Sequence, residues 1–104
     1  MLHGRPASAG TASGPARIVR GPDDFDRVRR GDVLICRFTD PAWTPLFGVV
    51  AAVVTEIGGP LSHAAIVARE QRIPAVVGVA EAMSVLVDGT PTTVDGTAGT
   101  VANC

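Results

Sequence analysis

One histidine stands where a nucleophile could act on a charged substrate. His63 follows a glycine pair, Gly58 and Gly59, and comes directly after Ser62, where an apolar run gives way to a helical pattern. Serine is a favourable N-cap residue, so the sequence predicts His63 at the first position of a helix. A helix N-terminus offers unpaired N–H groups and a partial positive charge, and glycine lets the backbone approach a ligand closely. This arrangement predicts an imidazole placed to hold a phosphoryl group covalently.

The imidazole of His63 allows more than one interpretation. Free imidazole has a pKa of about 6.5, so a neutral ring nitrogen is available at pH 7 as a nucleophile toward phosphorus. A capping or structural histidine fits the same position. A metal site has little support, because no second histidine and no cysteine lies at ligand spacing. A serine hydrolase pair does not fit either, because Ser62 is adjacent in the chain and there is no nucleophile elbow.

Two details of the site stay open. The ring needs one nitrogen tied down and the other presented, and the candidates for the tying group are Thr55, Ser62 and a backbone carbonyl. Arg69 lies further along the predicted helix, where it fits a surface ion pair and a contact to phosphate equally well.

Short strands and helices must position the site. Apolar runs predict strands over residues 15–19, 33–36, 49–55 and 75–79, with helical or irregular segments over 23–30, 41–47, 63–72 and 81–86. Residues 1–14 are rich in small residues and predict a loop-like lead-in. The repeat of Val-Asp-Gly-Thr at 87–90 and 94–97 predicts two hairpin corners. The order favours a single mixed α/β domain with more strands than helices.

Composition excludes several function classes. The chain has 104 residues, a net charge of −1 and one tryptophan, Trp43, with no tyrosine and no basic stripe, which argues against nucleic-acid binding. All basic residues are arginine, so lysine chemistry is ruled out. Cys36 and Cys104 do not form a disulfide framework. No signal pattern is present and the longest apolar run, 46–54, is about half a membrane span, so we expect a cytoplasmic protein without a membrane partner.

The central run resembles a known family signature. Gly-Gly-Pro-Leu-Ser-His-Ala-Ala-Ile-Val-Ala-Arg at 58–69, with Ile-Pro-Ala-Val-Val-Gly at 73–78, is similar to the phosphohistidine (swivelling, or mobile) domain of phosphoenolpyruvate-utilising enzymes. Residues 31–34, 39–43 and 94–97 also resemble that domain. The family includes phosphoenolpyruvate synthase, pyruvate phosphate dikinase, enzyme I and rifampicin phosphotransferase. The resemblance implies one β/β/α swivelling domain over residues 1–104, a mixed sheet packed with helices.

The resemblance also implies a function. His63 would carry a phosphoryl group between a phosphoenolpyruvate or ATP site and an acceptor site, with Gly58, Gly59 and Ser62 shaping its turn and Arg69 closing the motif. No cofactor or metal is implied in this domain. Phosphoenolpyruvate, or ATP with Mg²⁺, is expected on partner modules, namely an ATP-grasp-type nucleotide module or a phosphoenolpyruvate/pyruvate barrel, in trans or from a longer parent chain. The alternative is a binding or regulatory module that keeps the scaffold without phosphoryl transfer.

One position departs from part of the family. Leu61 lies two residues before the histidine, where dikinase-like members have a threonine that can be phosphorylated for regulation. That regulation is not expected here, and the synthase-like and rifampicin phosphotransferase-like branches are nearer. The donor, the acceptor and the oligomeric state do not follow from the sequence, nor does the choice between a free-standing chain and part of a larger enzyme.

Overall fold

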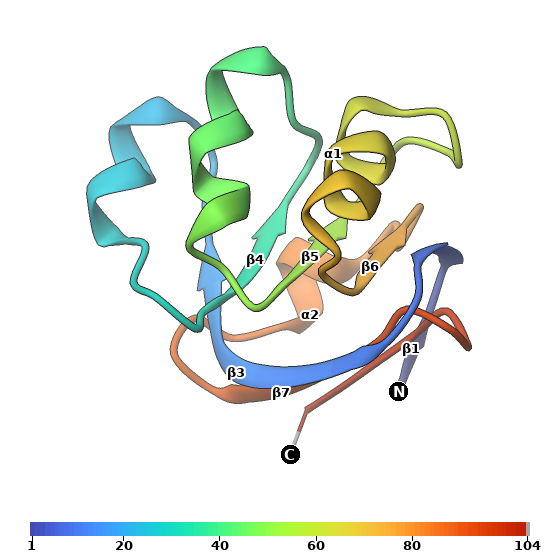
Figure 1. The fold of residues 1–104 in the computed structure, drawn as a ribbon. Coiled ribbons are helices and arrows are strands. Elements are labelled where there is room, and N and C mark those ends of the chain that lie inside the picture. Colours follow the sequence, from blue (N-terminus) through green and yellow to red (C-terminus); the bar gives the residue numbers. More distant parts are fainter. Residues whose placement is uncertain (104) are drawn as a thin grey trace.

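The chain folds into one mixed β-sheet with helices packed on both faces (Figure 1). The computed structural model describes residues 1–103. In chain order the elements are β1 (Leu2–His3), β2 (Arg5–Ser8), β3 (Thr11–Ile18), the 3-10 helix η1 (Pro22–Arg27), β4 (Val33–Cys36), the 3-10 helix η2 (Pro41–Gly48), β5 (Ala52–Thr55), α1 (His63–Gln71), β6 (Ala75–Val77), α2 (Ala82–Val85), β7 (Pro91–Asp95) and β8 (Thr100–Asn103). The strand order is β1-β8-β7-β3-β4-β5-β6-β2. This confirms the predicted mixed sheet with helices.

The four central strands β3, β4, β5 and β6 run parallel. Every residue of β4 and β5 is buried, as expected for strands covered on both faces. The connections η1, η2 and α1 each follow the carboxyl end of one of these strands. Segments that leave the carboxyl ends of parallel strands meet at one edge of the sheet, so this edge brings the connecting segments together.

Two hydrophobic cores lie on opposite faces of the sheet. One contains side chains from η2 and α1, including Trp43, Phe47 and Ala65. The other contains Ala82 and Leu86 beside the opposite face of β4 and β5. Trp43 and Phe47, four residues apart in η2, are both buried. The ring of Phe25 packs edge-on against Trp43 at a centroid distance of 5.0 Å.

The N-terminal segment is strand, which corrects the predicted loop-like lead-in over residues 1–14. β1 pairs with β8, β2 pairs with β6, and residues 11–15 of β3 pair with β7. The small residues of this segment show little apolar alternation, so the sequence gives no strand signal. Backbone hydrogen bonds to neighbouring strands hold the segment in the sheet instead. Gly4 shows how closely it is packed, since a Cβ there would lie 2.5 Å from the Val77 carbonyl oxygen.

Two further expectations change in detail. The helical segment predicted over residues 23–30 is shorter and forms the 3-10 helix η1. Of the two predicted hairpin corners, only the turn after Asp95 joins neighbouring strands, β7 and β8. The turn at Asp88 connects α2 to β7 instead, and the Asp88 carboxylate accepts a hydrogen bond from the Ile18 amide of β3 at 2.7 Å.

Cys36 is a buried core residue. Burial, helped by the nearby charge of Glu56, raises the pKa of its thiol to about 12. Cys104 lies outside the described residues. Within residues 1–103, no helix is both long and apolar enough to cross a bilayer. The same part of the chain contains no cluster of three or more His, Cys, Asp or Glu side chains that could hold a metal ion.

Candidate functional site

His63 is the first residue of α1, as the sequence predicts. Ser62 is the N-cap residue and has an extended backbone, and its hydroxyl oxygen accepts a hydrogen bond from the Ala65 amide at 3.4 Å. The first-turn amides of a helix have no intrahelical partners, so the imidazole leaves the backbone beside unpaired N–H donors. The cap therefore fixes both the start of α1 and the place of the ring.

The two glycines before the helix have different roles in the turn. Gly58 has a φ of 116°, a conformation that favours glycine, and a Cβ there would lie 3.1 Å from the Ser62 Cβ. Gly59 has open space where a Cβ would lie, and its carbonyl accepts from the Ser62 amide at 3.0 Å. The Thr55 hydroxyl, a candidate for tying the ring, instead donates to the Ile57 carbonyl at 3.0 Å. These contacts shape the turn that delivers His63.

The imidazole itself is held by residues of and beside η2. Thr39 Oγ1 lies 2.6 Å from Nδ1 of His63, and Thr44 Oγ1 lies 3.2 Å from Nε2. The Phe47 ring meets the imidazole edge-on at a centroid distance of 6.0 Å. Thr39 is buried, Thr44 is exposed, and the histidine is half-buried between them. The Nδ1 side of the ring therefore faces the protein and the Nε2 side faces solvent.

Sequence reasoning missed both threonines as partners of the ring. Neither is the tying group that was expected, Thr55, Ser62 or a backbone carbonyl. The start of η2 does have a local signal in the sequence. The Asp40 side chain caps this helix by accepting a hydrogen bond from the Ala42 amide at 2.9 Å. That cap and the prolines of η2 set the direction of the 3-10 helix. The contact between η2 and α1 is tertiary, however, and no spacing in the sequence encodes it.

Arg69 binds backbone rather than a carboxylate. Its guanidinium donates from Nη1 to the Ala7 carbonyl at 2.9 Å and from Nη2 to the Pro60 carbonyl. Two roles fitted Arg69 equally well in the sequence, a surface ion pair and a contact to phosphate, and no ion pair involves Arg69 within the described chain. Arg69 thus ties β2 and the turn before the histidine to the last part of α1, which is a positioning role.

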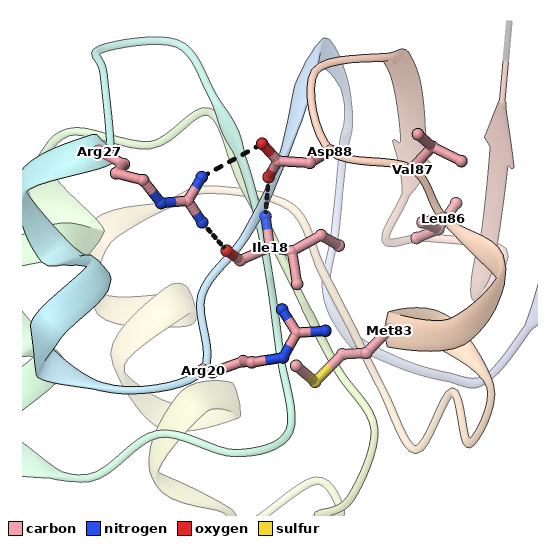
Figure 2. Close-up of a pocket in the computed structure, with 7 residues that line it drawn as sticks. All are labelled: Ile18, Arg20, Arg27, Met83, Leu86, Val87 and Asp88. Carbon is pink, nitrogen blue, oxygen red and sulfur yellow. Dashed lines mark hydrogen bonds and ion pairs between the residues drawn. The ribbon is translucent and has the colours of Figure 1, made fainter.

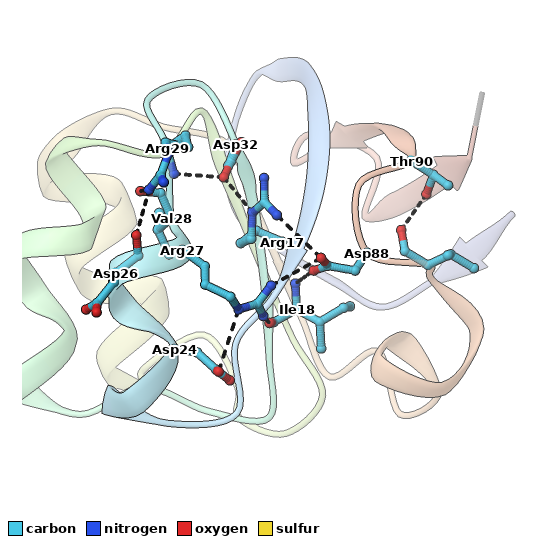
Figure 3. Close-up of polar contacts among 11 residues, drawn as sticks. Arg17, Ile18, Asp24, Asp26, Arg27, Val28, Arg29, Asp32, Asp88 and Thr90 are labelled. Carbon is cyan, nitrogen blue, oxygen red and sulfur yellow. Dashed lines mark hydrogen bonds and ion pairs between the residues drawn. The ribbon is translucent and has the colours of Figure 1, made fainter.

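A separate polar network joins η1, β3 and the turn before β7 (Figure 3). Arg17 pairs with the buried Asp32 at 2.9 Å, and Arg27 pairs with Asp88 at 3.2 Å. Desolvation opposes ionisation of Asp88, but the Ile18 amide and the two arginines outweigh it and lower the pKa of Asp88. Arg27 is therefore a structural residue, because its guanidinium forms an ion pair with Asp88.

Ile18, Arg27 and Asp88 of this network also border a shallow pocket of about 450 Å³ (Figure 2). Its wall includes Arg27 on one side and Val87 on the other, and Arg20 lies beside Met83 of α2 (Figure 2). His63 does not line it. The half-buried imidazole, with its Nε2 side toward the exposed Thr44, is therefore a site separate from this pocket.

Comparisons with known proteins point to one family. The family model for the mobile domain of PEP-utilising enzymes matches residues 28–99. The chain is 48% identical over 100 residues to the uncharacterised phosphotransferase YvkC of Bacillus subtilis, which covers 96% of this chain and 12% of that protein. It is 46% identical to rifampicin phosphotransferase of Bacillus subtilis, covering 92% and 11%, and 45% identical to phosphoenolpyruvate synthase of Aeropyrum pernix, covering 97% and 12%. The chain thus spans about an eighth of the length of these relatives.

Solved structures show the same architecture. An NMR structure of Enzyme I (nEIt) aligns with a TM-score of 0.64 at 36% identity, over 73% of this chain and 32% of that chain. Aconitase X of Thermococcus kodakaraensis aligns with a TM-score of 0.77 at 20% identity, over 99% and 97%. At that identity the second match shows a shared fold alone.

Proposed function

Because the chain belongs to the family of PEP-utilising enzyme mobile domains, we propose that it is a phosphoryl carrier in which Nε2 of His63 is transiently phosphorylated. The observation that carries the proposal is the orientation of the imidazole. A buried threonine holds Nδ1 at 2.6 Å, while Nε2 faces the exposed side of η2. In the reactive tautomer Nδ1–H donates to Thr39 Oγ1, which leaves the lone pair on Nε2.

The transfer step balances on this tautomer. The Nε2 lone pair forms a bond to phosphorus as the bond from phosphorus to the donor's leaving atom breaks, and the leaving atom takes that electron pair. The ring keeps its Nδ1 proton, bonded to Thr39, so the phosphorylated imidazole is cationic beside its anionic phosphoryl group. The α1 N-terminus and the Ser62 hydroxyl favour that added negative charge. The reverse step delivers the phosphoryl group to the acceptor.

The donor and acceptor sites are placed on partner modules. We propose that phosphoenolpyruvate, or ATP with Mg²⁺, binds an ATP-grasp-type module or a phosphoenolpyruvate/pyruvate barrel, in trans or in a longer parent chain in the cytoplasm. Supporting this, the matched relatives are phosphotransferases and a phosphoenolpyruvate synthase that are much longer than this chain. His63 on this domain is the part that would move phosphoryl between such modules.

Labelling of His63 tests the carrier function. The chain is incubated with a relative's protein from which the matched segment has been deleted, with phosphoenolpyruvate or ATP as donor, and acid-labile, base-stable phosphate is measured. We expect label at His63 in the wild-type chain and none in His63→Ala. His3, which is exposed in β1, is the internal control for nonspecific labelling. Absence of label with every donor would refute the carrier function and favour a binding or regulatory module.

A further inference from the structure

Thr44 lies directly beside the proposed reactive nitrogen. Its Oγ1 is 3.2 Å from Nε2 of His63, and this is its one side-chain hydrogen bond in the described chain. Thr44 is exposed, unlike Thr39, whose hydroxyl is buried against Nδ1. Pro45 follows it inside η2, and the next turn is anchored by the buried Phe47. The Thr44 hydroxyl therefore lies at the solvent side of the ring, on a 3-10 helix whose buried residues pack into the core.

The tautomer of His63 determines whether the Thr44 hydroxyl donates or accepts in this contact. When Nδ1 carries the proton, Nε2 is an acceptor, so the contact at 3.2 Å requires the Thr44 hydroxyl to donate to it. A bond from Nε2 to phosphorus uses the same lone pair and removes that acceptor. The hydroxyl then lies next to the phosphoryl oxygens, which are charged and accept stronger hydrogen bonds than a neutral nitrogen does.

We propose that Thr44 is a switching donor for the carrier: its hydroxyl hydrogen-bonds Nε2 in the resting chain and a phosphoryl oxygen during and after phosphorylation. This inference rests on the proposed function of His63. The interaction is stronger in the transition state than in the resting state, which is the condition for accelerating the transfer. The proton stays on Nδ1 and Thr39 Oγ1 accepts its hydrogen bond throughout, so the two threonines serve the two ring nitrogens in different ways.

Two small reagents separate this role from simple positioning. Phosphoramidate transfers a phosphoryl group to the ring, because the P–N bond of the reagent breaks as P–Nε2 forms and ammonia leaves with the electron pair. Iodoacetamide alkylates the same nitrogen as iodide leaves, and no phosphoryl oxygen is involved. The rate at His63 is measured by peptide mass spectrometry for both reagents and divided by the rate at the exposed His3 in the same sample.

The variants are Thr44→Val, which removes the hydroxyl at nearly constant shape, and Thr44→Ser, which keeps it. Both reagents need Nε2 to be free, so the ratio of phosphorylation to alkylation isolates the bond to the phosphoryl oxygen. We expect Thr44→Val to lower this ratio about tenfold, the size of one hydrogen bond to a charged acceptor, and Thr44→Ser to restore most of it.

The outcomes distinguish the two proposals. An unchanged ratio in Thr44→Val overturns the switching donor alone, since wild-type His63 is still phosphorylated. A ratio that falls in Thr44→Val and is not restored in Thr44→Ser also overturns it, because the loss then follows shape and not the hydroxyl. Phosphorylation of wild-type His63 no faster than that of His3, together with normal alkylation, overturns the carrier function and this inference with it.

Discussion

Replacing Arg69 by methionine tests whether a guanidinium holds the histidine turn against the sheet. Methionine keeps most of the apolar stem and removes the donors to the Ala7 and Pro60 carbonyls. Ala7 lies at an irregularity of the β2–β6 ladder, between the pairs Pro6–Val76 and Ser8–Ala75. The loss therefore affects a carbonyl at a break in the regular ladder and the turn that precedes α1.

The expected magnitude follows from these two contacts. A hydrogen bond from a charged donor contributes about 1.5–3 kcal/mol when shielded, and less where water replaces it. Arg69 is exposed but Ala7 is buried, so we expect the pair of bonds to contribute about 2 kcal/mol to the free energy of unfolding. For a domain of this size that corresponds to a melting temperature about 10 °C lower.

Urea unfolding followed by Trp43 fluorescence measures the effect. Trp43 is the single tryptophan and is 6% exposed in the core, so its emission reports loss of packing. Arg30→Met is the matched control, because Arg30 is exposed and has no side-chain partner in the described chain. A loss in Arg69→Met that does not exceed the loss in Arg30→Met would show that the two carbonyl contacts stabilise nothing.

Three further predictions concern the glycine turn before α1 and the two side chains whose pKa values are shifted, Asp88 and Cys36. Gly58→Ala should destabilise the chain by about 1–3 kcal/mol because of its positive φ, whereas Gly59→Ala should change stability by less than about 0.5 kcal/mol; equal effects in chemical denaturation would contradict the assignment. Asp88→Asn should lower stability by about 1 kcal/mol at pH 7, and the difference from wild type should shrink as pH falls through the lowered pKa of Asp88; a difference independent of pH in acid titration counts against the ion pairs. The unfolded chain releases the Cys36 proton above pH 9.0 while the folded chain, with a pKa of about 12, retains it, so stability should fall by about 1.4 kcal/mol between pH 8 and pH 10. The fall should be absent in Cys36→Ala, and a slope unchanged by this substitution would rule out the thiol as its cause.

The local part of the site could be predicted from the sequence. Ser62 and the glycine pair determine the start of α1 through neighbours within a few residues, so the cap and the place of His63 follow directly. The partners of the imidazole could not be predicted in the same way. Thr39 and Thr44 reach the ring only after η2 packs against α1, and that packing depends on the common core of Trp43, Phe47 and the alanines of α1.

The sheet shows the same division. The buried runs of β4 and β5 are visible as continuous apolar residues, and the structure confirms strands there. The N-terminal strands carry no such pattern, since Arg5–Ser8 is held by backbone pairing to β6. Asp88 and Asp95 occupy the same position in the two copies of Val-Asp-Gly-Thr, but only the turn at Asp95 joins paired strands, while the Asp88 carboxylate accepts from the Ile18 amide of β3.

The pairing of the first and last strands has a mechanical consequence. Leu2 lies opposite Val101 and His3 opposite Thr100, so chain attached at either end leaves from the same corner of the body. That corner lies at the far side of the molecule from α1 (Figure 1). If further chain were attached at this corner of a body 30 Å in its longest dimension, a modest rotation about the attachment would move the imidazole through a wide arc, and the Thr39 and Thr44 contacts would move with it.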